Sequence, residues 1–273
     1  MSVEYEAAII IDDDDLENNL ANEEVTTPVV FKKARRTISK SVPLEKYYCD
    51  HDGTFEIGVD EVGRGPLFGR VYTAAVILPK DDSFDHSRMK DSKKFHSKKK
   101  IEEVAAYIKE NALAWHVSFE DEKKIDEINI LQATQLCMHN SILELRKQFN
   151  KKMKERNQQE HIDYSYFLLI DGNYFNPIQY MNQNTKKWEQ MNHMCVEGGD
   201  NAYSAIAAAS ILAKVERDRY IEELCSQNPT LKEHYAIDSN KGYGAKKHID
   251  GIKEHGITIW HRRSFGICKT FHI

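Results

Sequence analysis

A strand-like run that leads straight into two acidic residues and a glycine-rich turn most constrains how this chain can fold. Residues 55–59 read as a strand, and the next six are Asp60-Glu61-Val62-Gly63-Arg64-Gly65. Carboxylate oxygens are the ligands that Mg²⁺ and Mn²⁺ prefer, and a strand end holds them more rigidly than a loop does. Bare glycine backbone can approach another molecule closely, and arginine donors suit phosphate oxygens. The stretch predicts a metal site beside a phosphate site, whereas Asp-Glu alone would be an ordinary charged turn.

Hydrophobic spacing along the rest of the chain predicts an α/β fold without internal repeats. Strands are expected at residues 54–59, 71–78, 114–119 and 166–170. Helices are expected at 97–110, 130–149, 200–224 and 246–255. The first two strands are expected to pair, and residues 150–163 and 176–192 are interpreted as polar connections.

Two further carboxylates stand at the ends of predicted elements. Asp171 terminates the strand at 166–170, and Asp200 precedes the alanine-rich helix. On its own Asp200 is interpreted as a helix cap, with a ligand for a cation as the alternative. Together with Asp60 and Glu61 these acids form an oxygen-only set, the kind that two divalent ions need for in-line attack of water on phosphate. Their convergence depends on the fold.

Composition leaves the question of a nucleic-acid partner open. The net charge is −5, but 11 of the 43 acidic and 6 of the 38 basic residues lie within residues 1–50, which leaves 32 of each beyond them. Any case for nucleic acid therefore rests on local basic clusters at 90–100 and 241–248. A chain of 273 residues with 41% hydrophobic content suits one soluble catalytic domain, and no apolar run approaches the ~20 residues that span a membrane.

Residues 1–50 are predicted to be a disordered tail, acidic and then basic, because blocks of like charge resist folding. The basic cluster at 32–36 is interpreted as a solvated part of the tail. A nuclear localisation signal or an arm that binds nucleic acid are the alternatives, and the partner of the tail is left open. The five cysteines have no CxxC spacing, which predicts free thiols. The N-terminus lacks the basic residues with which a secretory signal peptide begins, so we expect an intracellular, cytoplasmic protein.

Several motifs, in order, resemble the ribonuclease HII group of type 2 ribonucleases H over residues 55–265, about four-fifths of the chain. They are Asp60-Glu61-Val62-Gly63-Arg64-Gly65-Pro66, Asp91-Ser92-Lys93-Lys94, Ile170-Asp171-Gly172-Asn173, the run from Ala207 to Val215, Lys241-Gly242-Tyr243-Gly244 and His261-Arg262-Arg263-Ser264-Phe265. Ala245 departs from this pattern, because the family often has threonine at that position.

The resemblance implies a ribonuclease H-like α/β core at 51–225, with a mixed central sheet flanked by helices, and a C-terminal helical extension at 226–273 that contributes to substrate binding. It implies a monomeric endonuclease that hydrolyses the RNA strand of RNA–DNA hybrids and incises 5′ to single ribonucleotides in duplex DNA, leaving 5′-phosphate and 3′-hydroxyl ends. Mg²⁺ or Mn²⁺ would be held by the catalytic acids, which are Asp60, Glu61, Asp171 and Asp200.

The resemblance also assigns Gly63, Arg64 and Gly65 to the segment that senses the ribose 2′-OH, and Tyr243 to the ring that packs at the RNA–DNA junction. Physical chemistry supports this, since the 2′-OH distinguishes RNA from DNA and exposed peptide groups can both donate to it and accept from it. Further contacts to nucleic acid are proposed for Lys93, Lys94, Lys214 and Ser204, although the lysines also suit a solvated surface and the serine a helix turn.

Two other functions are compatible with parts of the sequence. A related metal nuclease or recombinase acting on DNA would use similar acids on a similar core, but Gly63-Arg64-Gly65 and Tyr243 disfavour it. A nucleic-acid binding protein without turnover is disfavoured by four intact acids. A P-loop nucleotide site, and with it a bound organic cofactor, is not expected, because no GxxxxGK[ST] sequence occurs.

Overall fold

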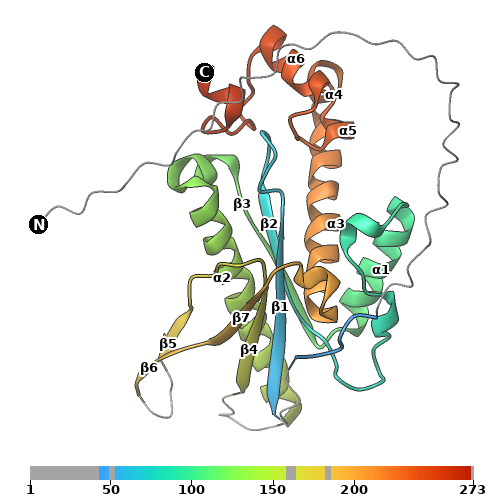
Figure 1. Ribbon diagram of the computed structural model, residues 1–273, viewed down its shortest axis with the longest axis vertical. Helices are drawn as coiled ribbons and strands as arrows, with labels where there is room; N and C mark the ends of the chain where they lie inside the picture. The colour runs from blue at the N-terminus through green and yellow to red at the C-terminus, as the bar shows by residue number, and fades with distance from the viewer. Residues whose placement is uncertain (1–42, 49–52, 158–163, 182–185, 272–273) are drawn as a thin grey trace, which may run out of the picture. The chain divides into compact units, whose positions relative to one another are not determined.

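Two antiparallel strands, β1 (Thr54–Val62) and β2 (Val71–Ile77), form the centre of the computed structural model (Figure 1). The structure describes residues 43–48, 53–157, 164–181 and 186–271. Every residue of β2 is buried, and its alternate side chains belong to two separate core clusters. Because successive side chains of a strand face opposite sides, this burial places a core on each face of the sheet.

The main sheet has the strand order β3-β2-β1-β4-β7, with β3 at Ala114–Glu120, β4 at Ser165–Asp171 and β7 at Asn192–Val196. Strands β2 and β3 pair antiparallel, whereas β1, β4 and β7 run parallel to one another. The carboxyl ends of these three strands therefore meet at one edge of the sheet. A separate two-stranded sheet pairs β5 (Gln179–Met181) with β6 (Trp188–Gln190).

Helix α2 (Glu122–Asn157) packs on one face of the sheet, and α3 (Ser204–Gln227) and α1 (Lys98–Asn111) pack on the other (Figure 1). The alanines of α3 let its backbone approach β1 closely at Gly58. A Cβ built on Gly58 would lie 2.2 Å from the carbonyl carbon of Ala205, closer than packed atoms allow. Glycine opposite small residues thus fixes the distance between helix and sheet.

The C-terminal segment contains α4 (Pro229–Tyr235), α5 (Ile237–Asn240), α6 (Lys246–His255) and a 3₁₀ turn (Gly266–Thr270). Its buried side chains form a cluster with Phe68 and with Ile221 and Leu224 of α3. The predicted α/β core with a C-terminal helical region is confirmed. The described residues, from 43 onward, belong to one compact unit, and the boundary at 225/226 stays a prediction.

Several predicted elements need correction. Strand β1 continues through Val62, so Asp60 and Glu61 lie inside the strand rather than after it. Helix α2 begins eight residues before the predicted residue 130, is interrupted at Asn129 (φ 66°, ψ 163°), and extends into the predicted connector. Strands β5, β6 and β7 and helices α4 and α5 were not predicted, because their short polar sequences lack a clear period.

Part of the predicted tail is folded. Glu45 pairs in a parallel bridge with Tyr203, with hydrogen bonds of 2.8 and 2.9 Å on its two sides, so residues 43–48 belong to the fold. The basic cluster at 32–36 lies outside the described residues. Cys137, Cys195, Cys225 and Cys268 are free thiols, as predicted. Among the described helices, none has the length and apolarity to cross a membrane.

Candidate metal and nucleic-acid site

Three of the predicted carboxylates converge at the carboxyl ends of β1 and β4. Val59 pairs with Ile170 in the parallel register, so the next residues, Asp60 and Asp171, are neighbours across the two strands. Together with Glu61 they offer three carboxylate oxygens that lie within 4.8 Å of one another. An oxygen-only cluster of this size suits a hard divalent cation such as Mg²⁺ or Mn²⁺.

Asp60 is the most deeply buried acid, with 4% of its surface exposed. Its carboxylate accepts from the backbone N–H of Glu61 at 2.6 Å and from the hydroxyl of Ser210 on α3. Burial, and then repulsion from Glu61 and Asp171, raise the pKa of Asp60 well above its usual range. A bound cation would relieve both effects, so the environment of Asp60 fits the metal ligand that the sequence predicts.

Glu61 differs from Asp60 because it is half-buried and has a cationic neighbour. Its Oε1 lies 3.2 Å from Nη1 of Arg64. Burial raises the pKa of Glu61, and the charge of Arg64 opposes that rise. The ion pair also places Arg64 next to the carboxylate cluster.

Asp200 does not belong to the compact set of three. It lies in a 3₁₀ turn (Gly199–Asn201) that precedes α3, and α3 has no side-chain cap, so the interpretation of Asp200 as a helix cap is wrong. Burial, and then repulsion from Asp91 and Asp171, raise its pKa. Asp200 is therefore electrostatically coupled to the cluster, and it borders the site on the side of β7.

Asp91, Ser92, Asn201 and Ser210 support the acids, and the sequence analysis gave none of them a role. The Asn201 amide donates to Asp200 at 2.9 Å and to Asp91 at 3.4 Å. The hydroxyls of Ser92 and Ser210 lie 3.0 Å apart, which extends the contacts of Asp60. Asp91 and Ser92 open a motif that was recognised, but hydrogen bonds across 110 and 118 residues leave no local signal.

The 63–70 loop, which joins β1 to β2, borders the acids. Gly63 has φ +95°, and a Cβ built there would lie 2.3 Å from Nε of Arg217, so only glycine fits. A Cβ built on Gly65 would meet only the ring of Tyr243, with its Cε1 at 3.6 Å. Tyr243 is 48% exposed. The structure therefore brings together the glycine turn and the tyrosine that the sequence analysis placed in one nucleic-acid site.

A family model for ribonuclease HII matches residues 57–268. The chain belongs to the ribonuclease HII family. The ribonuclease HII of Phocaeicola vulgatus is 42% identical over 217 residues, which cover 79% of this chain and 90% of that protein. The ribonuclease HII of Parabacteroides distasonis is 41% identical over 213 residues, which cover 78% of this chain and 90% of that protein. Membership makes the chain a hydrolase of the ribonuclease H class.

Solved structures agree with this family at the level of the fold. Ribonuclease H2 from Pyrococcus horikoshii aligns with a TM-score of 0.52 at 21% identity, over 79% of this chain and 96% of that one. Ribonuclease HII from Archaeoglobus fulgidus, solved in complex with PCNA, aligns with a TM-score of 0.50 at 24% identity, over 78% and 96%. At such identities the likeness concerns the arrangement of strands and helices.

The lysines predicted to contact nucleic acid differ in their surroundings. Lys93 is exposed; burial disfavours its charge, but Asp200 and Asp91 outweigh that effect and raise its pKa. Lys94 is exposed and donates to Asn201. Lys214, further along α3, donates to Asp218 at 2.7 Å. Lys93 and Lys94 thus border the carboxylates of this ribonuclease HII family member, whereas Lys214 is engaged in a local ion pair.

Ser204 differs from the other predicted contacts because its side chain is completely buried. It is the first residue of α3 rather than one turn into that helix, and its N–H donates to the carbonyl of Glu45 at 2.9 Å. Its hydroxyl has no hydrogen-bond partner among the described residues. Ser204 therefore has no surface to offer to a nucleic acid in this arrangement.

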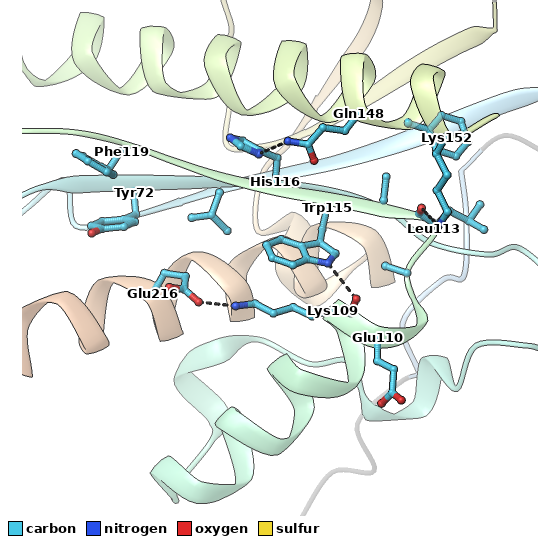
Figure 2. A pocket seen from close by; sticks show the side chains of 14 residues that line it. Tyr72, Lys109, Glu110, Leu113, Trp115, His116, Phe119, Gln148, Lys152 and Glu216 are labelled. Carbon is cyan, nitrogen blue, oxygen red and sulfur yellow. Dashed lines mark hydrogen bonds and ion pairs between the residues drawn. The ribbon is translucent and has the colours of Figure 1, made fainter. Parts of the chain in front are cut away.

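A cavity of about 730 Å³ along strand β3 contains none of the four acids (Figure 2). It is lined by Trp115, Phe119 and Tyr72, together with an ion pair of 2.6 Å between Lys109 and Glu216. A smaller cavity of about 170 Å³ is lined by Glu61, Arg64 and Asp171. Since nucleic acid is bound mainly on open charged surface, the carboxylate cluster rather than the larger cavity marks the candidate site.

Proposed function

We propose that this protein is an endonuclease that hydrolyses the RNA strand of RNA–DNA hybrids and incises 5′ to single ribonucleotides embedded in duplex DNA. The observation that carries the proposal is the convergence of three carboxylates within 4.8 Å, beside the 63–70 loop. A metal site next to a glycine turn would allow the protein to hydrolyse a phosphodiester bond and to contact the adjacent sugar at the same time. Products would carry 5′-phosphate and 3′-hydroxyl ends.

The residues fit two divalent cations, Mg²⁺ or Mn²⁺. Asp60, Glu61 and Asp171 supply a cluster of oxygen ligands, and Asp200 adds a fourth carboxylate on the side of β7. When bound, such ions supply Lewis acidity to the attacking water and to the leaving 3′-oxygen. Burial raises the pKa of Asp60 and of Glu61, and repulsion from Asp171 adds to it; a bound cation would stabilise the charged form of both carboxylates.

The protein's own side chains hold the substrate. Arg64, Lys93 and Lys94 are exposed cations around the acids and suit phosphate oxygens on either side of the scissile bond. Each can neutralise substrate charge that would otherwise repel the carboxylates. Lys214 is a weaker candidate, because its ammonium group already pairs with Asp218.

Recognition of the ribose is assigned to the peptide groups of Gly63, Arg64 and Gly65 and to the ring of Tyr243. A Cβ built on Gly65 would have that ring as its neighbour, with Cε1 of Tyr243 at 3.6 Å. A sugar placed beside Gly65 would meet backbone N–H groups and the Gly65 carbonyl on one side and an aromatic surface on the other. A deoxyribose offers no hydroxyl to those groups, so it would gain less transition-state stabilisation.

The test compares a DNA duplex carrying one ribonucleotide with an all-DNA duplex of the same sequence and with an RNA–DNA hybrid. Each is incubated with the purified protein in Mg²⁺, in Mn²⁺ or in chelator. We expect metal-dependent incision 5′ to the ribonucleotide and cleavage of the hybrid, with the all-DNA duplex intact. Asp171→Asn should abolish cleavage. Asp82→Asn, which removes the same charge from an exposed carboxylate, should leave it unchanged.

The alternative functions give different results in the same assay. Metal-dependent cleavage of both the all-DNA and the ribonucleotide duplex would identify a DNA nuclease. Binding to the duplexes without cleavage in either metal would identify a non-catalytic binding protein. Either outcome contradicts the proposal.

A further inference from the structure

Arg217 and Arg262 are the two largest side chains that are completely buried in the described structure. Burying a guanidinium is costly, and a carboxylate partner is the usual compensation. Among the described residues, neither side chain takes part in an ion pair. The two charges also repel each other, which adds to the effect of burial in lowering the pKa of Arg262, to about 9. Contacts other than ion pairs must therefore offset the cost of burying these two cations.

Arg262 directs every nitrogen of its side chain at backbone carbonyls of the 63–70 loop. Nε donates to Gly69 at 2.8 Å, and Nη2 donates to Gly63 at 2.6 Å. Nη1 donates to Arg64 and to Pro66, both at 2.9 Å. The backbone N–H of Arg262 completes the set by donating to Leu67 at 2.8 Å.

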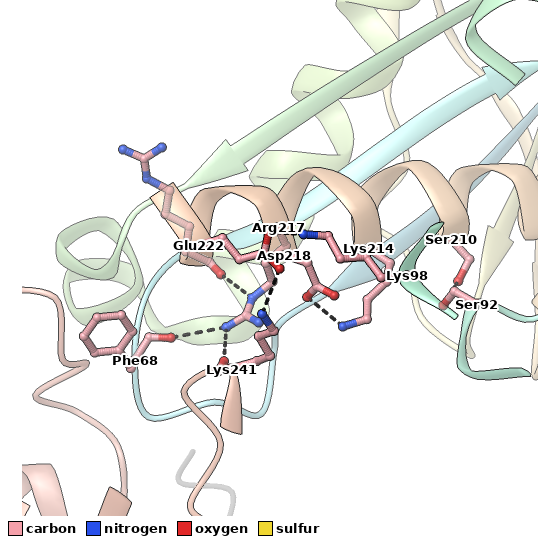
Figure 3. A network of polar contacts seen from close by, with 10 residues as sticks. Phe68, Ser92, Lys98, Ser210, Lys214, Arg217, Asp218, Glu222 and Lys241 are labelled. Carbon is pink, nitrogen blue, oxygen red and sulfur yellow. Dashed lines mark hydrogen bonds and ion pairs between the residues drawn. The ribbon is translucent and has the colours of Figure 1, made fainter. Parts of the chain in front are cut away.

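Arg217 donates to two carbonyls of the loop that Arg262 does not reach (Figure 3). Its Nε donates to Arg70 at 3.2 Å, and its Nη2 donates to Phe68 at 3.3 Å and to Lys241 at 3.0 Å. Lys241 precedes the segment that carries Tyr243, so Arg217 joins the loop to that segment. Among residues 63–70, every carbonyl except that of Gly65 therefore accepts from one of these two arginines.

This arrangement determines which peptide groups remain for a substrate. The carbonyls around Gly65 are turned inward, and the N–H groups of Gly63, Arg64 and Gly65 have no hydrogen-bond partner among the described residues. Gly63 is buried, so what remains at the surface is the N–H groups of Arg64 and Gly65 and the single free carbonyl of Gly65. A ribose 2′-OH needs both a donor and an acceptor. Only the planar, multi-donor guanidinium can hold so many carbonyls from one side.

We propose that Arg262 and Arg217 are positioning residues for ribose discrimination, which hold the 63–70 loop so that its free peptide groups face the 2′-hydroxyl. The inference rests on the proposed function and assigns its specificity to two side chains that never touch the substrate. We call the hydrogen bonds from Arg262 and Arg217 to the 63–70 loop the arginine clamp. The carboxylate cluster lies outside these contacts, so loss of the clamp should impair sugar recognition more than hydrolysis itself.

The test measures cleavage of two duplexes that differ only at one sugar, which carries either a 2′-hydroxyl or a 2′-fluoro group. Fluorine cannot donate a hydrogen bond, so the ratio of the two kcat/KM values reports recognition by the loop. We expect Arg262→Lys, which keeps a cation but loses the fork of donors, to lower this ratio at least tenfold. The ratio is independent of the folded fraction, because the same molecules cut both substrates.

A matched control separates positioning from general destabilisation. Leu145→Ala removes a completely buried side chain from the core cluster that includes α2 and should lower the thermal midpoint without changing the ratio. If Arg262→Lys yields no folded protein, the same ratio is measured for Arg217→Lys, with a smaller decrease expected because Arg217 holds only two carbonyls of the loop. An unchanged ratio in a folded, active variant would overturn the inference.

The same assay distinguishes a failure of the proposed function from a failure of the role proposed for the two arginines. If the unaltered protein cleaves neither duplex in Mg²⁺ or Mn²⁺, the assigned activity is wrong, and the clamp has no ribose to position. If it cleaves the hydroxyl duplex and Arg262→Lys retains the full ratio, the activity stands and only the role of the arginines is refuted.

Discussion

The backbone N–H of Gly199 donates to Oδ1 of Asp171 at 2.7 Å. This hydrogen bond connects the last residue of β4 to the turn that carries Asp200. Two acids that are 29 positions apart in the chain are thereby held at the same edge of the sheet. The acids are thus positioned by the ends of strands and by the turns that follow them, and each of these elements can be tested separately.

Asp60→Asn should separate stability from activity. The substitution removes a buried charge that burial and two neighbouring acids destabilise, so the free energy of unfolding without metal should stay equal or rise. Cleavage should fall by roughly a hundredfold or more, because a metal ligand is lost. Urea denaturation and single-turnover cleavage measure the two effects. Retained cleavage in Mg²⁺ would remove Asp60 from the ligand set.

The same variant tests cation binding without any substrate. Mg²⁺ or Mn²⁺ at one hundred times its Kd should stabilise the unaltered protein by about 2.7 kcal/mol, since the folded state alone has the site. The shift in thermal midpoint should be much smaller for Asp60→Asn. Equal shifts in both proteins would mean that the cation binds elsewhere.

Asn201→Ala should weaken catalysis without removing a carboxylate. The amide of Asn201 holds Asp200 and Asp91, so its loss frees Asp200 to move relative to Asp171. Loss of a residue that orients a metal ligand typically costs 10–100-fold, so we expect a decrease of about tenfold and a higher metal concentration for half-maximal cleavage. A metal titration of the cleavage rate measures both effects. Unchanged curves would mean that Asn201 does not position Asp200 for catalysis.

Gly58→Ala should destabilise the fold strongly. The new Cβ would lie 2.2 Å from the backbone of Ala205, so α3 would have to shift away from β1, at a cost of about 3 kcal/mol or more. Gly244→Ala is the matched control, because its Cβ would meet only side-chain carbons at 3.7 and 3.8 Å. Urea denaturation of both variants distinguishes close packing from a general intolerance of alanine at glycine positions.

Acid should destabilise the protein through two buried histidines. Thr258 N–H donates to His261 Nδ1 at 2.9 Å, so His261 carries its proton on Nε2 and donates to His248, which donates to the Tyr243 carbonyl at 2.8 Å. Burial lowers the pKa of both rings, that of His261 to about 3. The neutral pair is favoured fully above pH 6.5, where the unfolded histidine is also neutral.

Stability is therefore lost as the pH falls below 6.5, because the unfolded state then binds protons that the folded state refuses. For His261 the loss amounts to roughly 3 kcal/mol by pH 4. His261→Asn should flatten the dependence of the unfolding free energy on pH over this range. His96→Gln, at an exposed position, should leave the slope unchanged. An equally steep slope in His261→Asn would assign the acid sensitivity to other groups.

The sequence predicted the acids and their strands because both signals are local. An apolar run that leads into Asp60 and Glu61, and another that ends at Asp171, indicate the two strands directly, although β1 continues through both acids to Val62. The short strand β7 was missed because it begins with Asn192 and His193 and resembles a polar connection. Without β7, the sequence could not show how Asp200 reaches the edge of the sheet.

The supporting residues could not be predicted, for a different physical reason. Arg217 and Arg262 look like surface cations in a sequence, because arginine is rarely buried without a carboxylate. Their partners are backbone carbonyls up to 199 residues away, and a carbonyl leaves no mark in a sequence. The hydrogen bonds that join Asn201 to Asp91 and Ser210 to Ser92 are also non-local, because they span 110 and 118 residues.

The parallel order of β1, β4 and β7 also determines when the acids first meet during folding. Parallel strands need long crossovers, and pairs that join residues 60, 171 and 200 form slowly, since loop closure must come before the contacts that reward it. A nascent or partly folded chain that has made only the β1–β2 hairpin holds two acids and no complete site. Hydrolytic capacity should therefore appear only after β4 and the turn that carries Asp200 have joined β1.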